Sequence, residues 1–365
     1  MSEATVFVGA IGGGGHGEQI VKALRCVERG RYRIVGGDAS QYCPQFADVD
    51  VPVIMPKAND PAYLDALLAI CRKFGVQAVF HGCEPELAVL NKNRALFAEQ
   101  GLLLPINAAD VIETCMDKQL SGAFLESAGF VPPISTAFNR RDVVDEIEKF
   151  PVIVKPALGG GGSRDTYIAQ SKNQLKLLAE FLDVENETFL IQEYVGTFEQ
   201  EYTVGVLHDL DGEFIGSIAI RRLINSALNM RFAVRNKTGR DELGEWLVVS
   251  SGVSQGEVGD FPEVRAQCEA IAGALGSRGP LNIQCRFVDG KIKVFEINPR
   301  FSGTTSLRAM MGFNEPDLLL RRHLLGETDR APPEYQMGMI IRSLRETILP
   351  ENPPADWRTT LAQTP

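Results

Sequence analysis

The most constraining feature of the sequence is a predicted β-hairpin at residues 281–298, with a tight turn at Asp289-Gly290. Polar and apolar residues alternate along its first strand, and its second strand ends in Glu296-Ile297-Asn298. Because successive side chains of a strand point to opposite faces, the alternation predicts one apolar and one polar face. The first strand contributes Leu281, Ile283, Cys285 and Phe287 to the apolar face and Asn282, Gln284 and Arg286 to the polar face.

The register of this hairpin decides whether the polar side chains of both strands share a face. A two-residue loop would place Gln284 opposite Phe295 and turn Glu296 toward the apolar side. A three-residue loop, residues 289–291, places Gln284 opposite Glu296 instead. We predict the three-residue loop, in which Phe295 and Ile297 join the apolar side. The polar face would then carry Asn282, Gln284, Arg286, Glu296 and Asn298.

This polar face predicts a site for a hard cation. Mg²⁺ prefers oxygen ligands, and proteins usually hold it with one or two carboxylates together with substrate phosphates. Glu296 supplies a carboxylate, while Gln284 and Asn298 supply amide oxygens. The alternative is a solvated sheet face without a metal, and the motifs elsewhere in the chain favour the metal site.

Composition is that of an ordinary globular protein and excludes some classes. The length of 365 residues predicts two or three domains, and 44% of the residues are hydrophobic and 23% charged. The net charge of −10 argues against a general nucleic-acid-binding surface. No apolar run is long enough to span a bilayer, and the start of the sequence lacks a signal peptide's basic region, so we expect no membrane partner. The seven scattered cysteines predict reduced thiols in a cytoplasmic protein.

Residues 1–115 alternate predicted strands and helices, which is typical of a parallel, doubly wound sheet. The turn after the first strand contains Gly12-x-Gly14-x-x-Gly17, with Asp38 at the end of the next strand. This is the form of a dinucleotide fingerprint, although four consecutive glycines satisfy many patterns. Three interpretations stay open: a nicotinamide site, a tight strand-to-helix turn, and a turn that faces a substrate.

A second glycine-rich segment, residues 157–164, joins the predicted strands 150–156 and 167–169. Lys155 precedes the glycines and no lysine follows them, so the segment is not a Walker A loop. The tip of such a hairpin can fold over phosphates with its backbone N–H groups, while Lys155 neutralises their charge. The alternative is a mobile surface hairpin. Because four glycines cost conformational entropy on ordering, we favour phosphate binding. Residues 223–258 are predicted to be irregular.

Taken in order, the motifs resemble those of the ATP-grasp superfamily. They are Asp117-Lys118, Lys155-Pro156 with the glycine-rich segment, Gln192-Glu193-Tyr194-Val195, Glu201-Tyr202-Thr203-Val204, Asn282-Ile283-Gln284 and Glu296-Ile297-Asn298-Pro299-Arg300. The resemblance covers about residues 5–326 and is closest to one half of the carbamoyl phosphate synthetase large subunit and to stand-alone carboxylate–amine (amino-acid) ligases.

The resemblance implies an α/β fold that becomes α+β in its second part. A Rossmann-like pre-ATP-grasp domain would span residues 1–115 and explain the first glycine turn without a nicotinamide. A two-lobed ATP-grasp domain would span 116–330, with a small lobe at about 116–190 and a large lobe at about 191–330. The tail, 331–365, would pack on the core, with a last strand at 339–341.

The resemblance also implies a site, residue by residue. The ATP-binding residues would be Lys118, Lys155, Gly160, Gly161, Gly162, Ser163, Gln192, Glu193, Tyr194, Val195, Glu201 and Arg222. Gln284, Glu296 and Asn298 would hold two Mg²⁺ ions, for which Mn²⁺ can substitute. Lys155 and Arg300 would be catalytic, with Arg300 at the reacting phosphoryl group. For the substrate we predict Arg286, Gly303, Thr304 and Arg308, and the further arginines Arg222, Arg231 and Arg235 suggest a carboxylate-rich or phosphorylated molecule.

The implied activity is ATP-dependent ligation of a carboxylate to an amine through an acylphosphate, with release of ADP and phosphate. Such chemistry needs positioning and charge neutralisation more than a covalent nucleophile. The partners would be small-molecule carboxylates and amines, and a homodimer stays open. The alternatives are phosphorylation of bicarbonate or carbamate, a nicotinamide oxidoreductase, and nucleotide binding without catalysis. Carbamoyl phosphate synthetase has two such halves where this sequence matches one, which favours the ligase.

Overall fold

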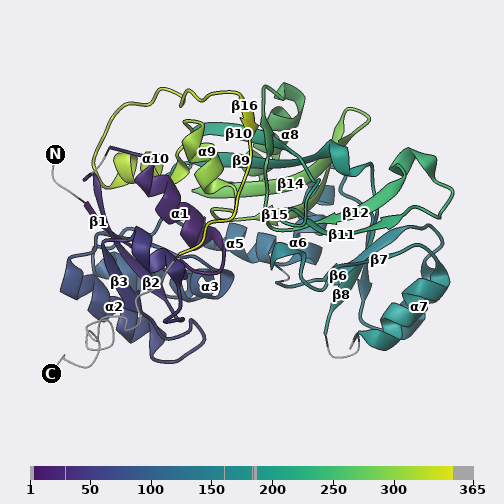
Figure 1. Cartoon of the computed structure of the whole chain (residues 1–365), viewed down its shortest axis with the longest axis horizontal. Coiled ribbons are helices and arrows are strands. Elements are labelled where there is room, and N and C mark those ends of the chain that lie inside the picture. Colours follow the sequence, from purple (N-terminus) through teal and green to yellow (C-terminus); the bar gives the residue numbers. More distant parts are fainter. Residues whose placement is uncertain (1–3, 29, 160, 183, 185–186, 348–365) are drawn as a thin grey trace.

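The computed structural model describes residues 4–347, except 29, 160, 183 and 185–186 (Figure 1). Its strands form a parallel sheet near the N-terminus, a small antiparallel sheet, a large antiparallel sheet and a separate two-stranded sheet. The predicted α/β architecture, with a parallel first part and antiparallel sheets after it, is confirmed. Within the part of the chain that is described, no helix is long and apolar enough to cross a membrane.

The first sheet has the strand order β3-β2-β1-β4, and all its neighbours are parallel. Its strands are β1 (Ala4–Val8), β2 (Tyr32–Asp38), β3 (Val51–Ile54) and β4 (Ala78–Phe80). The helices of this part are α1 (His16–Arg25), α2 (Tyr63–Phe74), α3 (Glu84–Lys92), α4 (Arg94–Glu99) and α5 (Ala109–Met116). Consecutive residues of β1 are buried on opposite faces, Val6 in the same apolar cluster as Ile20 of α1 and Phe7 in that of Leu67 of α2. This explains why the strand is apolar throughout.

The small antiparallel sheet has the order β5-β8-β6-β7. Its strands are β5 (Ser135–Phe138), β6 (Val152–Pro156), β7 (Tyr167–Ala169) and β8 (Phe189–Glu193), with helices α6 (Lys118–Ser127) and α7 (Lys172–Phe181) nearby. Phe138, Val154 and Leu175 belong to its core. The glycine-rich segment joins β6 to β7 and includes one 3₁₀ turn, η3 (Gly161–Ser163), while Gly160 lies outside the described residues.

The large sheet is antiparallel, in the order β15-β14-β9-β10-β13-β16. Its strands are β9 (Glu201–His208), β10 (Phe214–Arg222), β13 (Gly256–Val258), β14 (Pro280–Val288), β15 (Lys291–Asn298) and β16 (Gly338–Ile340). Its helices are α8 (Pro262–Ala274), α9 (Thr305–Met310) and α10 (Glu315–His323). Val206 belongs to the cluster of Ile271 on α8, and Leu207 to that of Leu319 on α10, so helices cover both faces.

One apolar cluster joins the N-terminal sheet to the large sheet. It includes Val8 of β1, Ile20 of α1, Ile218 of β10 and Leu320 of α10. This shared core fixes the loops at the end of the parallel sheet against the large sheet. The remaining short helices are the 3₁₀ turns η1 (Pro44–Asp48), η2 (Arg141–Glu146), η4 (Phe198–Gln200) and η5 (Asp241–Leu243).

The prediction that residues 223–258 are irregular is wrong. They include β11 (Met230–Arg235), β12 (Trp246–Ser250) and β13, and β11 pairs with β12 in its own two-stranded sheet. Gly239 and Gly244, both with positive φ, interrupt the connection and hide the pattern. The run Trp246-Leu247-Val248-Val249 is rich in β-formers and was the available signal.

The hairpin of β14 and β15 differs from the prediction at its turn and agrees with it at its end. Asp289 and Gly290 form a two-residue loop with φ of 51° and 74°, and Val288 pairs with Lys291. A bulge after this stretch leaves Phe295 unpaired, and Gln284 therefore faces Glu296. The three-residue loop was wrong because the bulge, not the turn, contributes the extra residue.

The described part of the C-terminal tail returns to the large sheet. After α10 the chain arches over to β16 (yellow in Figure 1), which pairs with β13 through Ile340 and Gly256. The predicted strand at 339–341 is present one residue earlier. Residues 348–365 of the predicted tail lie outside the described residues.

Candidate active site

Two cavities meet at Gln284 and Glu296, which line both. The first, here called the nucleotide cleft, lies between the small and the large antiparallel sheets. Its walls are Lys118, Pro133, Ile153, Lys155, Pro156, Ser163, Thr166, Gln192, Glu193, Tyr194, Val195, Glu201, Val248, Val249, Ser250, Gln284, Arg286, Phe295 and Glu296. The predicted ATP residues that line it are therefore Lys118, Lys155, Ser163, Glu201 and the four residues 192–195.

Two lysines enter the nucleotide cleft from the small lobe. Lys118 begins α6, and its Nζ donates to the carbonyl of Gly159 at 2.7 Å. Lys155 of β6 donates to Oε1 of Gln192 at 2.8 Å and to the carbonyl of Phe295 at 2.9 Å. The bulged residue thus presents its carbonyl to the lysine across the cleft, and its side chain lines the cleft rather than the predicted apolar side.

Burial, together with the charge of Lys118, lowers the pKa of Lys155 to about 7, while Glu296 acts in the opposite direction. A buried ammonium with neutral partners is poorly stabilised. A polyphosphate in the cleft would supply the missing negative charge.

A buried cluster around Glu201 forms the floor of the cleft. Oε1 of Glu201 accepts from Arg222 Nη1 at 2.7 Å and from Ser250 Oγ at 2.6 Å, and Oε2 accepts from Arg286 Nη2 at 3.3 Å. Although burial acts to raise the pKa of Glu201, the two arginines hold it below its usual value. Glu201 is therefore a fixed anion that can accept hydroxyl hydrogen bonds from a ligand.

The segment 192–195 crosses between the lobes. The carbonyl of Val195 accepts from Arg286 Nη1 at 3.0 Å, and the ring of Tyr194 lies 4.5 Å below the Arg286 guanidinium. The Tyr194 hydroxyl accepts from the Val248 N–H at 2.8 Å. These contacts connect the segment to β12 and β14, so this wall of the cleft is fixed to the large lobe.

The predicted metal ligands lie together where the cavities join. Gln284 Nε2 donates to Glu296 Oε2 at 2.6 Å, and the backbone pairs Asn282 with Asn298 next to them. Asn298 lines the second cavity. One carboxylate and two amides on adjacent strands fit the oxygen ligands that Mg²⁺ prefers.

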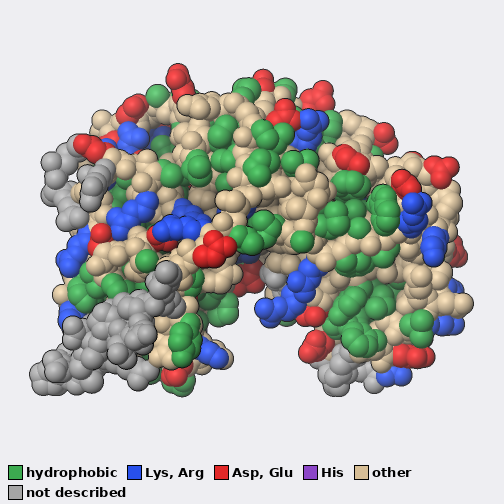
Figure 2. Space-filling model, viewed as in Figure 1, with side chains coloured by type: hydrophobic (Ala, Val, Ile, Leu, Met, Phe, Trp, Pro, Cys, Tyr) green, Lys and Arg blue, Asp and Glu red, His purple; other side chains and the backbone are tan. Residues whose placement is uncertain are grey.

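The second cavity, here called the substrate cavity, is bounded by three parts of the chain. The N-terminal sheet contributes residues 13–16 and 82–85, the glycine-rich segment contributes Gly162 and Arg164, and the large lobe contributes the rest. The remaining walls are Thr203, Ala227, Leu228, Met230, Arg231, Ser251, Gly252, Val253, Ser254, Asn282, Gln284, Glu296, Asn298, Arg300, Ser302, Gly303 and Thr304. Figure 2 shows the molecule hollowed between the N-terminal part and the small lobe.

The glycine turn therefore faces the substrate cavity, the third of the three interpretations. Its Gly12 N–H donates to Asp38 Oδ2 at 2.8 Å. In a dinucleotide site the acidic residue binds a ribose hydroxyl, whereas here Asp38 accepts a hydrogen bond from the turn itself. His16, which follows the turn, contacts His81 at 3.1 Å between Nε2 and Nδ1. Burial, with the charge of Arg300, lowers the pKa of both histidines, that of His81 to about 3.

Arg300 lies in the substrate cavity and contacts the N-terminal part of the chain. Its Nη2 donates to Glu84 Oε1 at 2.8 Å and its Nη1 to the carbonyl of Phe301 at 3.1 Å, while its buried Nε has no hydrogen-bond partner among the described residues. Sequence analysis missed Glu84. It follows β4, and ligand sites of parallel sheets lie beyond the carboxyl ends of the strands, so this placement was the available signal.

Comparisons with known proteins agree with this geometry. A family model described as "PylC-like, N-terminal domain" matches residues 10–104, and one described as "ATP-grasp in the biosynthetic pathway with Ter operon" matches residues 248–347. The biotin carboxylase domain of the Hydrogenobacter thermophilus 2-oxoglutarate carboxylase, solved as a dimer with MgADP and bicarbonate, superposes with a TM-score of 0.62 and 18% identity, covering 90% of this chain and 70% of that one. The chain has the ATP-grasp fold.

Other relatives with this fold extend the likeness. The L-amino acid ligase from Bacillus licheniformis superposes with a TM-score of 0.60 and 17% identity, covering 88% of this ATP-grasp chain and 74% of that one. The carbamoyl phosphate synthase large chain of Thermoplasma acidophilum is 26% identical over 263 residues, 68% of this chain and 23% of that protein. That of Neisseria meningitidis serogroup A is 28% identical over 252 residues, 67% and 22% respectively. The chain thus spans about a quarter of the length of these curated relatives.

Four arginines predicted for ligand contact in the ATP-grasp domain lie elsewhere. Arg308 is fully buried and pairs with Glu315 at 3.1 Å, so it is a structural arginine and lines neither cavity. Arg222 lies behind Glu201 and lines neither cavity. Arg286 lines the nucleotide cleft rather than the substrate cavity. Arg235 is exposed beside Glu245. Of the predicted substrate residues, Gly303, Thr304 and Arg231 do line the substrate cavity.

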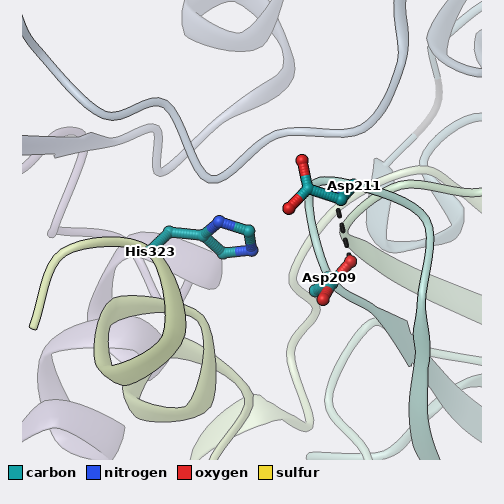
Figure 3. A group of neighbouring side chains, drawn as sticks. All are labelled: Asp209, Asp211 and His323. Carbon is teal, nitrogen blue, oxygen red and sulfur yellow. Dashed lines mark hydrogen bonds between the residues drawn. The ribbon is translucent and has the colours of Figure 1, made fainter. Parts of the chain in front are cut away.

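Another group of potential ligands lies outside both cavities of the ATP-grasp fold. Asp209, Asp211 and His323 approach one another between β9 and α10 (Figure 3). Asp209 already accepts from the Asp211 N–H at 3.0 Å and pairs with Arg322 at 3.4 Å. His323 Nε2 accepts from the Leu210 N–H at 3.0 Å. These bonds explain the cluster as a structural contact between a turn and a helix end.

Proposed function

We propose that this protein is an ATP-dependent carboxylate–amine ligase that works through an acylphosphate and releases ADP and phosphate. The observation that carries the proposal is that the nucleotide cleft and the substrate cavity share Gln284 and Glu296. A nucleotide bound in the cleft would present its terminal phosphate at this junction, where a carboxylate in the other cavity can receive it.

The residues of the cleft support binding of ATP. Glu201 is an anion that can accept hydrogen bonds from ribose hydroxyls. Lys118 and Lys155 would neutralise the charge of the phosphates, and the glycine-rich segment would cover them. Gln284, Glu296 and Asn298 would hold Mg²⁺, which when bound neutralises phosphate charge. Arg300 would stabilise the phosphoryl group from the substrate side.

A second candidate is phosphorylation of bicarbonate or carbamate, as the name of the carbamoyl phosphate synthase relatives suggests. The substrate cavity argues for a larger substrate, because its walls come from residues as distant as Gly13, Gly82 and Met230. Bicarbonate, with one carbon and three oxygens, would leave most of these walls without contact.

A substrate panel tests the proposal. Purified protein with ATP and Mg²⁺ would be assayed for ADP and phosphate release against single amino acids, amino-acid pairs, other carboxylates and bicarbonate. The ligase proposal expects release that needs a carboxylate and rises when an amine is added. Release with bicarbonate alone would favour the second candidate, and ATP binding without any release would make the protein a nucleotide-binding module.

A further inference from the structure

The Glu84–Arg300 ion pair joins two domains inside the substrate cavity. Glu84 is the first residue of α3 and is held at the end of the parallel sheet, while Arg300 follows β15 of the large sheet. Their atoms Oε1 and Nη2 are 2.8 Å apart, and the side chains keep 21% and 11% of their surface exposed, Glu84 being the more accessible. Both line the cavity, so a ligand can reach each partner.

Charge in the cavity is unevenly distributed. Among the described residues that line it, the carboxylates are Glu84 and Glu296, and the cations are Arg164, Arg231 and Arg300. Glu296 lies beside Gln284 at the junction with the nucleotide cleft. There it would bind the proposed metal ion and would not be available to a substrate. Glu84 is then the carboxylate left for a cationic group of a substrate.

The same pair explains when Glu84 becomes available. If a phosphoryl group in the junction attracts Arg300, Glu84 loses its cation while it remains largely buried. A buried carboxylate without a partner is strongly destabilised, so a substrate cation that replaces the arginine is favoured. Binding of the amine and formation of the acylphosphate are thereby coupled through one carboxylate.

We propose that Glu84 binds the amino group of the second substrate as an ammonium ion, once Arg300 has turned toward the phosphoryl group. The inference rests on the proposed ligase function and specifies its nucleophile: a primary amine that arrives as a cation, loses one proton to solvent, and then attacks the acylphosphate carbonyl as the free amine while phosphate leaves. Glu84 is assigned binding of the amine and no part in forming the acylphosphate.

Two nucleophiles of different charge test this assignment. Hydroxylamine is uncharged near neutral pH and traps an acylphosphate as a hydroxamate, so it needs no carboxylate partner. In Glu84→Gln we expect the KM for the amine, tested with the standard amino acids, to rise about tenfold to a hundredfold, the range for a lost charged hydrogen bond. Hydroxamate formation from the same carboxylate, and the KM for ATP, should stay within about twofold of wild type.

Glu257→Gln is the matched control, because it removes a carboxylate from an exposed pair with Arg221 outside both cavities and should change neither reaction. An equal loss of hydroxamate and amine coupling in Glu84→Gln would mean that Glu84 only positions Arg300, and an unchanged KM for the amine would also overturn the inference. If Glu84→Gln does not fold, Glu84→Asp must raise the same KM by a smaller factor. Absence of hydroxamate from the wild-type protein with every carboxylate would instead refute the ligase function itself.

Discussion

In the proposed function, metal binding at the junction would depend on the carboxylate of Glu296. The amides of Gln284 and Asn298 supply dipoles only, so Glu296→Gln keeps the shape of the site and removes its anionic oxygen. Because a bound metal contributes several kcal/mol to transition-state charge stabilisation, we expect turnover at saturating ATP to fall about a hundredfold or more. Lys291→Ala is the control. Lys291 is exposed at the far end of the same strand, so its substitution should leave turnover nearly unchanged. Near-normal ADP release by Glu296→Gln would exclude this hairpin as the metal site.

In the proposed function, Lys155 would make ATP binding depend on pH. Its pKa of about 7 in the free protein should rise when the triphosphate supplies negative charge. At about pH 8, binding should therefore take up a fraction of a proton, and at about pH 6, where Lys155 is already charged, the uptake should vanish. Calorimetry in buffers of different ionisation enthalpy measures this directly. Lys155→Met should abolish the uptake, and proton-neutral binding at pH 8 by the wild type would disprove the shift.

Glu86, buried beneath the glycine turn, makes folding stability depend on pH. Burial raises its pKa to about 7, although the Gly82 N–H, which donates to Oε2 at 2.8 Å, acts to lower it. The folded state then binds more protons than the unfolded state between about pH 4.5 and pH 7. The associated stability is present below the unfolded pKa and is lost as pH rises through 7. Denaturant unfolding should show Glu86→Gln more stable at about pH 8, by up to about 3 kcal/mol. A parallel pH profile in variant and wild type would refute this.

At the scale of elements, the glycine-rich hairpin contacts the large lobe backbone to backbone. A Cβ on Gly252 would lie 2.9 Å from the Cα of Gly162, which is closer than real side chains allow. Gly252→Ala should push the hairpin away from the cleft and raise the KM for ATP, by about tenfold for a cost in the usual range for overpacking. Gly122→Ala in α6 is the control, because a Cβ there meets nothing within 4 Å. An unchanged KM in Gly252→Ala would show that this backbone contact has no part in ATP binding.

The hairpin of β14 and β15 shows how much of the structure can be predicted from the sequence alone. Polar alternation predicted correctly that Gln284 faces Glu296, because burial of one sheet face fixes which residues pair. It failed at the turn, because Asp-Gly prefers a two-residue loop and a bulge has no sequence signature of its own. The predictions for the arginines were wrong for a related reason. The buried ion pair of Arg308 with Glu315 depends on how α9 packs against α10, and the periodicity of strands and helices does not encode that packing.

At the scale of the whole molecule, the glycine turn belongs to the substrate cavity, and this gives a prediction on cofactors. Because Asp38 accepts a hydrogen bond from the Gly12 N–H, the Asp38 carboxylate is not free to bind a ribose. Purified protein should bind ATP with Mg²⁺ and should not bind NADH or NADPH, as measured by fluorescence titration and calorimetry. Micromolar affinity for a nicotinamide cofactor without affinity for ATP would overturn both the placement and the proposed function. The domain limits proposed at residues 115 and 330 await limited proteolysis.

The division of the walls between the two cavities has a consequence for how such a protein can change. Among the described residues, the nucleotide cleft is lined entirely from Lys118 onward, whereas the two loops of the parallel sheet reach only the substrate cavity. Exchanging residues 13–16 and 82–85 for those of a relative would alter which molecules are accepted and leave the energy-supplying half intact. In the proposed function, substrate specificity and phosphoryl transfer would therefore lie in separate parts of the chain, and loop grafting would change the first without changing the second.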